Sequence, residues 1–138
     1  MAVPYITVAA GNPGNPEAPK KYYARAKSSG EVTLKKLSRE ISEGSTTVSD
    51  TDALAVLNEL TKILRRNLSE GRIVRFGDFG SFQIAIKSAG AETEEKFHQS
   101  LIKNPKVAFR PGADLKEMLA TLKYTKTGSS QDGKTKTD

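Results

Sequence analysis

The stretch Gly71–Lys87 decides the expected fold and reads Gly-Arg-Ile-Val-Arg-Phe-Gly-Asp-Phe-Gly-Ser-Phe-Gln-Ile-Ala-Ile-Lys. An apolar run starts at Ile73, and after the glycines apolar residues alternate with small or polar ones as far as Lys87. A period of two is typical of a strand with one buried and one solvent-facing side. Gly77 and Gly80 bracket a segment suited to a tight turn. The stretch therefore predicts a strand, a turn and a second strand.

Basic residues mark the solvent-facing side of this hairpin. Lys87 is in phase with the polar positions of the second strand, and the register decides whether Arg72 or Arg75 joins it from the first. Further along, Lys106 to Arg110 predicts a returning strand whose two cations share one face. A basic sheet face indicates an anionic partner.

Two amphipathic helices are expected before the hairpin. Thr33 is suited to cap a short helix that runs to about Glu43. Ser49, with Asp52 three residues on, resembles a capping box and starts a longer helix that Gly71 ends.

The apolar stripe of the long helix is wide for a protein of this size. Its members are Ala53, Val56, Leu57, Leu60, Ile63, Leu64 and Leu68. One small helix and one sheet should not cover this width, so the stripe predicts a dimer. The alternative is a wide core within one domain, because isolated apolar stripes are usually core.

The N-terminal segment predicts a second hairpin. Tyr5–Ala10 and Lys20–Lys27 are expected strands on either side of a segment rich in Gly, Asn and Pro. The cations Lys20, Lys21 and Arg25 stand beside two tyrosines, a combination suited to nucleic acid. The alternative is a covering hairpin whose tyrosines pack on the core.

Two further segments complete the chain. Thr93 is a suitable cap for a short helix to Leu101, and Asp114 is expected to cap a final helix after a Pro-Gly pair. Residues 125–138 are polar and show no apolar periodicity, which predicts a disordered tail.

The composition narrows the class of protein. The chain has 138 residues, 22 Lys and Arg against 16 Asp and Glu, a formal net charge of +6 and no cysteine. One folded unit is expected at this length, and the charge favours nucleic acid or another anionic surface. No stretch has the pattern of a signal peptide or a membrane span. We therefore expect a soluble cytoplasmic protein without membrane contact.

Catalytic chemistry is not expected. The one histidine, His98, has no partner histidine at metal-ligand spacing, and Gly77-x-x-Gly80 lacks the further residues of a phosphate loop. We expect no enzyme activity, no catalytic residues, no metal, no cofactor and no small-molecule substrate.

Two spaced motifs, Gly-Asp-Phe-Gly-Ser-Phe at 77–82 and Phe-Arg-Pro-Gly-Ala-Asp-Leu-Lys at 109–116, give the chain a family resemblance. Together with the order of elements they resemble the HU/IHF family of bacterial histone-like DNA-binding proteins. The similarity covers about 33–123. The N-terminal extension is similar to the HU-like branch found in Bacteroides-type bacteria.

The resemblance implies an α+β, HU-like fold with two N-terminal helices, an antiparallel sheet and a C-terminal helix, forming an intertwined dimer. It implies an extension at 1–30, an HU-like domain at 31–124 and the tail after it. It places Lys87, Arg110 and Lys116 at basic DNA-contacting positions, and the expected DNA-binding set adds the other cations named above: Arg72, Arg75, Lys106, Lys20, Lys21 and Arg25.

The chain also departs from the family pattern. Ala85 and Ala113 stand where the family often has Arg or Lys, and the Arg-Asn-Pro arm tip that wedges between base pairs is absent. Asn104-Pro105 lies too close to the returning strand to serve as that tip.

Three functions follow from the sequence and the resemblance. The leading one is largely sequence-independent binding of double-stranded DNA by a homodimer in the nucleoid, through a basic sheet saddle. The alternatives are an HU-fold structural or interaction module that binds a protein partner, and RNA binding.

Overall fold

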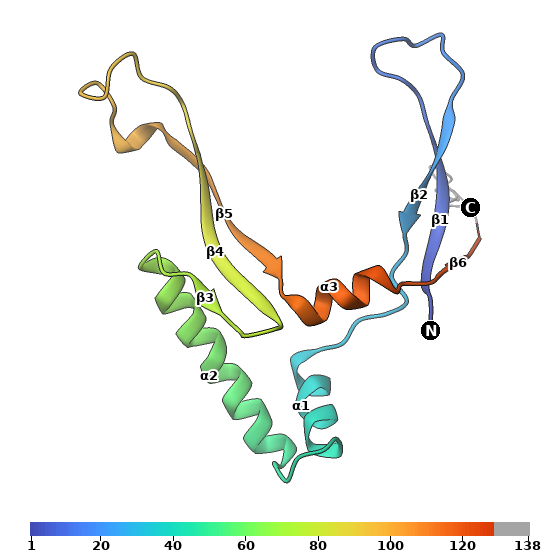
Figure 1. Ribbon diagram of the computed structural model, residues 1–138, viewed down its shortest axis with the longest axis vertical. Coiled ribbons are helices and arrows are strands. Elements are labelled where there is room, and N and C mark those ends of the chain that lie inside the picture. The colour runs from blue at the N-terminus through green and yellow to red at the C-terminus, as the bar shows by residue number, and fades with distance from the viewer. Residues whose placement is uncertain (129–138) are drawn as a thin grey trace, which may run out of the picture. The chain divides into compact units, whose positions relative to one another are not determined.

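The structure, a computed structural model, describes residues 1–128 and contains two compact units. One unit combines Met1–Glu31 with residues 121–128, and the other comprises Val32–Ala120. The elements of Figure 1 are, in chain order, β1 (Val3–Ala10), β2 (Lys21–Ala26), α1 (Leu34–Glu43), α2 (Asp50–Ser69), β3 (Val74–Arg75), β4 (Gly80–Ser88), the 3-10 helix η1 (Gln99–Leu101), β5 (Ile102–Pro111), α3 (Ala113–Ala120) and β6 (Tyr124–Lys126).

The first unit is a three-stranded sheet in the order β2-β1-β6. β1 and β2 are antiparallel and form the N-terminal hairpin that the sequence predicts, and β1 pairs with β6 in parallel. The backbone nitrogen of Val3 donates to the Lys123 oxygen over 2.8 Å, and that of Thr127 to the Tyr5 oxygen over 2.9 Å.

The strand β6 corrects the sequence-based expectation for the C-terminal segment. A disordered tail was expected from Thr125 and a domain boundary after residue 124. Instead, Tyr124–Lys126 is a strand, and residues 121–128 belong to the N-terminal unit. Backbone hydrogen bonds to β1 form this strand, so it needs no apolar periodicity of its own. Residues 129–138 of the expected tail lie outside the described residues.

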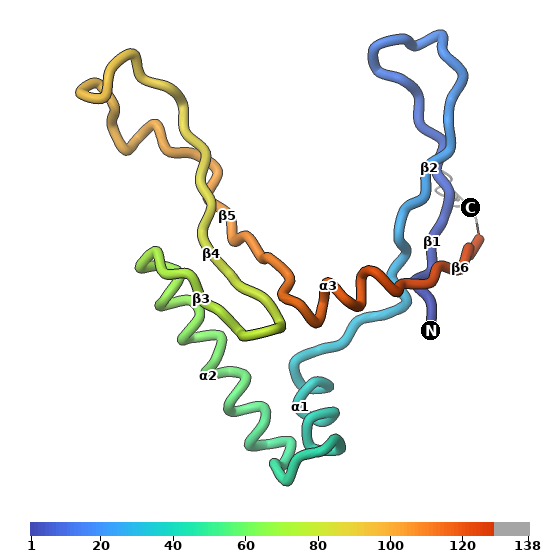
Figure 2. The backbone as a smooth tube through the Cα atoms, viewed as in Figure 1, coloured from blue at the N-terminus to red at the C-terminus, as the bar shows by residue number. Residues whose placement is uncertain are grey.

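The second unit contains an antiparallel sheet in the order β3-β4-β5. Figure 2 shows β4 and β5 running side by side as a long hairpin. Their register pairs Gly80 with Pro111 at one end and Ser88 with Ile102 at the other. The expected returning strand began at Lys106, so β5 starts earlier than predicted. Its extra length comes from pairing with β4 and not from its own alternation.

The first two helices of the second unit, α1 and α2, begin where the sequence predicts. The Thr33 side chain accepts a hydrogen bond from the Lys36 backbone nitrogen at 3.2 Å and starts α1, and Ser49 accepts from Asp52 at 3.1 Å and starts α2. α3 begins at Ala113, so Asp114 lies in its first turn and not at the cap. These elements confirm the α+β class, with three α-helices and an antiparallel sheet in the second unit.

The helix expected over Thr93–Leu101 is not present. Turns occupy the segment, and only Gln99–Leu101 form a short 3-10 helix, started by the His98 side chain accepting from the Ser100 nitrogen at 3.2 Å. The cap and acids at Thr93 are local signals, and a helix this short does not outweigh its nucleation cost without packing. The segment is instead the loop that closes the hairpin, where Ala89 donates to the Leu101 oxygen at 2.9 Å.

Four phenylalanines pack against one another beside the tight turn. The ring centroids of Phe82 and Phe109 are 4.8 Å apart, those of Phe76 and Phe82 are 5.3 Å apart, and those of Phe79 and Phe109 are 5.4 Å apart. These separations suit tilted and edge-on aromatic packing. The cluster joins the two sequence motifs. Phe109 belongs to the motif at 109–116, whereas Phe79 and Phe82 belong to the motif at 77–82 and Phe76 directly precedes it.

Little of the described chain is buried. Ala53 and Leu68 of α2 are the buried apolar residues among positions 1–128, and large apolar side chains on the same helix are exposed, including Val56 at 64 % and Ile63 at 38 %. Within the described part, no helix is long and apolar enough to span a bilayer.

Candidate nucleic-acid interface

Two arginines meet across the middle strand of the β3-β4-β5 sheet. Arg75 on β3 pairs with Ser81, and Ser81 pairs with Arg110 on β5. Residues directly opposite in an antiparallel pair share one face, so both guanidinium groups stand on the same side of the sheet. They line a shallow hollow of about 220 Å³ together with Gly77, Gly80, Ser81, Pro111 and Gly112. The register thus selects Arg75, and not Arg72, as the partner of Arg110.

The same face carries lysines further along the hairpin. Lys106 lies opposite Ala85, and Lys87 lies opposite Lys103. Ser81, Gln83, Ala85 and Lys87 alternate on β4 with the apolar positions of the other face. We call this surface, made of Arg75, Lys87, Lys103, Lys106 and Arg110, the basic face. All five side chains are exposed.

Lys103 was not among the expected site residues. Strict alternation along β5 places it with Val107 and Phe109, away from the basic face. A register shift between Ala85 and Lys87 places Lys103 opposite Lys87, on the basic face. The dipeptide Asn104-Pro105 is the sequence signal for the shift, because Asn tolerates a positive φ and Pro cannot donate a ladder hydrogen bond.

The basic face has no counter-charge on its own strands. β3, β4 and β5 contain no Asp or Glu, and no salt bridge within residues 1–128 involves any of its five cations. Charges that are neither paired nor buried add to a local positive potential. The sheet therefore presents to solvent five cations that are unpaired within residues 1–128.

Close backbone contacts at the tight turn hold the arginine pair in place. Gly80 has φ +149, and a Cβ there would meet the Phe109 ring at 2.7 Å. Phe76 donates to the Gly80 oxygen at 2.8 Å, and Phe79 donates to the Phe76 oxygen at 3.1 Å. Glycine permits both this conformation and this approach of β5.

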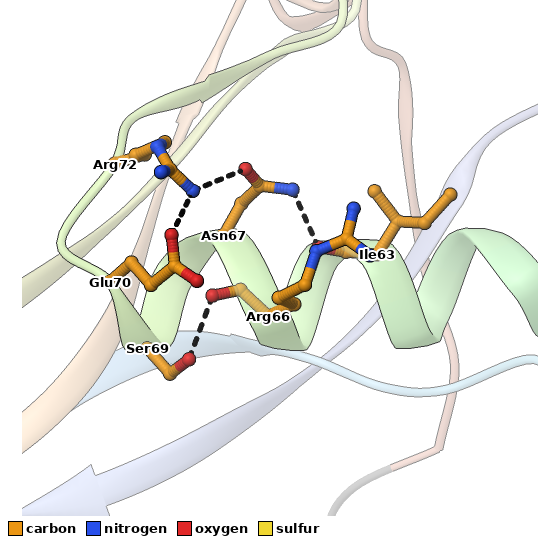
Figure 3. A network of polar contacts seen from close by, with 6 residues as sticks. All are labelled: Ile63, Arg66, Asn67, Ser69, Glu70 and Arg72. Atoms are coloured by element: carbon orange, nitrogen blue, oxygen red, sulfur yellow. Dashed lines mark hydrogen bonds and ion pairs between the residues drawn. The ribbon is translucent and has the colours of Figure 1, made fainter.

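Arg72 lies outside the strands and is engaged within the chain. Its guanidinium donates to the Asn67 side-chain oxygen at 3.1 Å and forms a salt bridge with Glu70. Figure 3 shows this network at the end of α2, where the Asn67 amide also donates to the Ile63 oxygen at 2.9 Å. The geometry ties the helix end to the chain that leads into β3.

Lys116 is exposed on α3, and its backbone nitrogen donates to the Gly112 oxygen at 3.0 Å. The helix thus begins directly after the hollow beside Arg110. The Lys116 side chain adds a further exposed cation within the same unit.

The remaining expected cations belong to the first unit. Lys21 and Arg25 lie on β2, four residues apart, and share a face with Tyr23, whereas Lys20 precedes the strand. Tyr22 and Tyr23 point to opposite faces and are 75 % and 56 % exposed. The alternative in which both tyrosines pack on a core is not seen in the described chain.

The described residues contain no group of three or more His, Cys, Asp or Glu side chains able to hold a metal. His98 contacts Ser100, with 3.0 Å between its Nδ1 and the Ser100 hydroxyl. Its contacts serve the hairpin loop.

Comparison with solved structures places the fold. The chain is 20 % identical to Anabaena HU in a cocrystal with DNA, with a TM-score of 0.50 over 64 % of this chain and 98 % of that one. A crystal structure from Bacteroides vulgatus, of a protein proposed to bind DNA, is 9 % identical, with a TM-score of 0.64 over 94 % of this chain. The chain spans 50 % of the length of that structure. No curated protein matches the sequence.

These likenesses define an HU-like fold. A family model described as "HU domain fused to wHTH, Ig, or Glycine-rich motif" matches residues 1–126. The chain belongs to this HU-HIG family, which confirms the resemblance drawn from the two sequence motifs.

Proposed function

We propose that this protein is a non-enzymatic, largely sequence-independent DNA-binding protein that acts as a homodimer in the nucleoid. The observation that carries the proposal is the basic face, with five exposed cations on one side of a sheet whose strands hold no acid. Phosphate contacts from Lys and Arg supply most of the affinity of sequence-independent binding.

The spacing of the cations suits a duplex better than a small anion. They occur along the length of β4 and β5, from the Arg75 and Arg110 pair at the turn to Lys87 and Lys103 near the hairpin loop. A strand rises about 3.3 Å per residue, so the charges span roughly 20 Å over the six residues from Ser81 to Lys87. That length covers several phosphates of one groove.

Exposed apolar surface on the second unit supports the homodimer. Val56, Leu60 and Ile63 on α2 are 64 %, 38 % and 38 % exposed, and Phe79 and Phe109 are 46 % and 41 % exposed. Val56, Leu60 and Ile63 share one face of α2 by their spacing, and exposed apolar patches on soluble proteins mark interaction sites. In a twofold-symmetric dimer, the same apolar residues of two copies of the chain pack against each other and are buried.

The other cations take secondary roles in this proposal. Lys116 contributes an exposed cation from α3, and Lys20, Lys21 and Arg25 form a separate basic cluster on the first unit. Arg72 contributes less, because Glu70 and Asn67 already engage its guanidinium.

A salt titration with random-sequence duplex tests the proposal. Affinity should fall linearly on logarithmic axes as salt rises, because cations displace counterions from the phosphates. Equal affinity for unrelated duplex sequences is expected. If DNA binding is absent or does not depend steeply on salt, the protein-partner alternative is favoured. If the protein prefers RNA to a DNA duplex of matched sequence, the RNA alternative is favoured.

A further inference from the structure

The ladder between β4 and β5 contains one extra residue on β5. Ala85 pairs with Lys106 and Lys87 pairs with Lys103, so two steps along β4 correspond to three along β5. Asn104 lies in this interval with φ 52 and is the one non-glycine residue of positive φ in the described chain. The interval is therefore a β-bulge made by Asn104 and Pro105.

The bulge moves Lys103 from one face of the sheet to the other. With unbroken alternation, Lys103 would share the face of Val107 and Phe109, where the aromatic cluster lies. The inserted residue reverses the phase, and Lys103 stands directly opposite Lys87 on the basic face. Both residues that build the bulge suit it, because Asn adopts positive φ and Pro has no N–H to pair.

The pairing of Lys87 with Lys103 is unfavourable in the free protein. Like charges directly opposite on one face repel, and no salt bridge among residues 1–128 compensates either of them. An anion held between the two ammonium groups removes the repulsion. Side chains of opposed residues start about 5 Å apart, which lets two lysines reach one phosphate group.

We propose that the Asn104–Pro105 bulge builds a two-lysine phosphate site from Lys87 and Lys103 near the end of the hairpin, which takes a phosphodiester of the bound duplex. This inference rests on the proposed DNA binding and adds a contact point beyond the arginine pair at the turn. The site is the end of the basic face that lies nearest the hairpin loop.

A double-mutant cycle with Lys87→Gln and Lys103→Gln tests the site. Each single variant should weaken binding to random duplex about threefold and flatten the salt slope by about one unit per protomer. Because both lysines hold one phosphate, the double variant should lose clearly less than the product of the two single losses. Lys35→Gln, an equal charge change on α1, is the matched control and should alter the slope far less.

A second measurement, on the DNA-free protein, separates this site from a merely additive surface. Lys103→Gln should raise the unfolding midpoint by about 2 °C at low salt, and the gain should vanish at high salt. Independent, multiplicative losses of DNA affinity together with no change in the midpoint would overturn the two-lysine site. If Arg75→Gln and Arg110→Gln weaken binding while Lys103→Gln has no effect, the site fails and the DNA-binding proposal stands. If none of these variants changes DNA binding, the basic face itself is not the interface.

Discussion

The backbone nitrogen of Gly112 donates to the carbonyl oxygen of Phe79 over 2.9 Å, which joins the β3–β4 turn to the start of α3. The Asp114 nitrogen adds a second bond, at 3.2 Å, to the Asp78 oxygen. Two sequence motifs about thirty residues apart thus form one structural unit, and Arg75 and Arg110 stand beside it. The turn contacts fix the spacing of the arginine pair.

Replacing Gly112 by Ala should destabilise the protein. A Cβ at this position would overlap the Asp78 carbonyl oxygen and lie 3.0 Å from the Gly80 nitrogen. Forced repacking of this kind costs about 1–3 kcal/mol in the free energy of unfolding. Urea unfolding measures it. Gly90→Ala is the matched control, because a Cβ there meets nothing within 4 Å, and equal stability of the two variants would contradict this packing account.

Sedimentation tests the homodimer. At micromolar concentration we expect twice the 15.0 kDa mass of one chain. Leu60→Glu should dissociate or unfold the protein, since it places a charge in the apolar stripe of α2. Asn58→Glu makes the same charge change at a polar position of that helix and should leave the mass unchanged. A folded monomer at every concentration would remove the dimer.

The Ser49 cap of α2 offers a stability test. Ser49→Ala removes the acceptor of the Asp52 N–H, now 3.1 Å from the hydroxyl. The expected loss is about 1 kcal/mol in the free energy of unfolding. Thermal unfolding monitored by circular dichroism gives the value. Ser45→Ala, in the exposed loop before α2, is the control, and a loss as large there would argue against a capping effect.

Local signals explain which parts of the fold were predictable. Thr33 and Ser49 cap their helices through side chains three residues from their donors, and the alternation around Phe82 sets the faces of β4. These features depend on neighbours in sequence. The helix expected at Thr93 was wrong for the same reason, because its cap signal has no packing partner to support it.

Non-local pairing explains what the sequence did not show. Tyr124–Lys126 becomes a strand because β1 offers an open edge, and β1 lies more than one hundred residues earlier. Lys103 reaches the basic face because a bulge reverses the phase of β5. The choice between Arg72 and Arg75 likewise needed the register, which pairs Arg75 with Ser81.

DNA bending should be shallow compared with relatives that insert a proline. The hairpin loop carries Glu92, Glu94 and Glu95, and the Arg-Asn-Pro wedge is absent. Acids near the duplex repel phosphates, and without a wedge no base step is unstacked. Energy transfer across an end-labelled duplex reports the angle. A sharp bend that disappears in Phe97→Ala would show instead that Phe97, which is 43 % exposed, acts as the wedge.

The central claim is that the basic face binds the DNA backbone, and the salt dependence of a Lys87→Gln, Arg110→Gln double variant tests it most directly. We expect weaker binding to every duplex sequence alike and a salt slope flatter by roughly one to two units per protomer. Stability should change by no more than about 0.5 kcal/mol, because both side chains are exposed. A Lys35→Gln, Lys36→Gln variant makes the same charge change on α1 and should keep the wild-type slope. Unaltered affinity and slope in the Lys87→Gln, Arg110→Gln protein would contradict the account and direct the search to Lys20, Lys21 and Arg25.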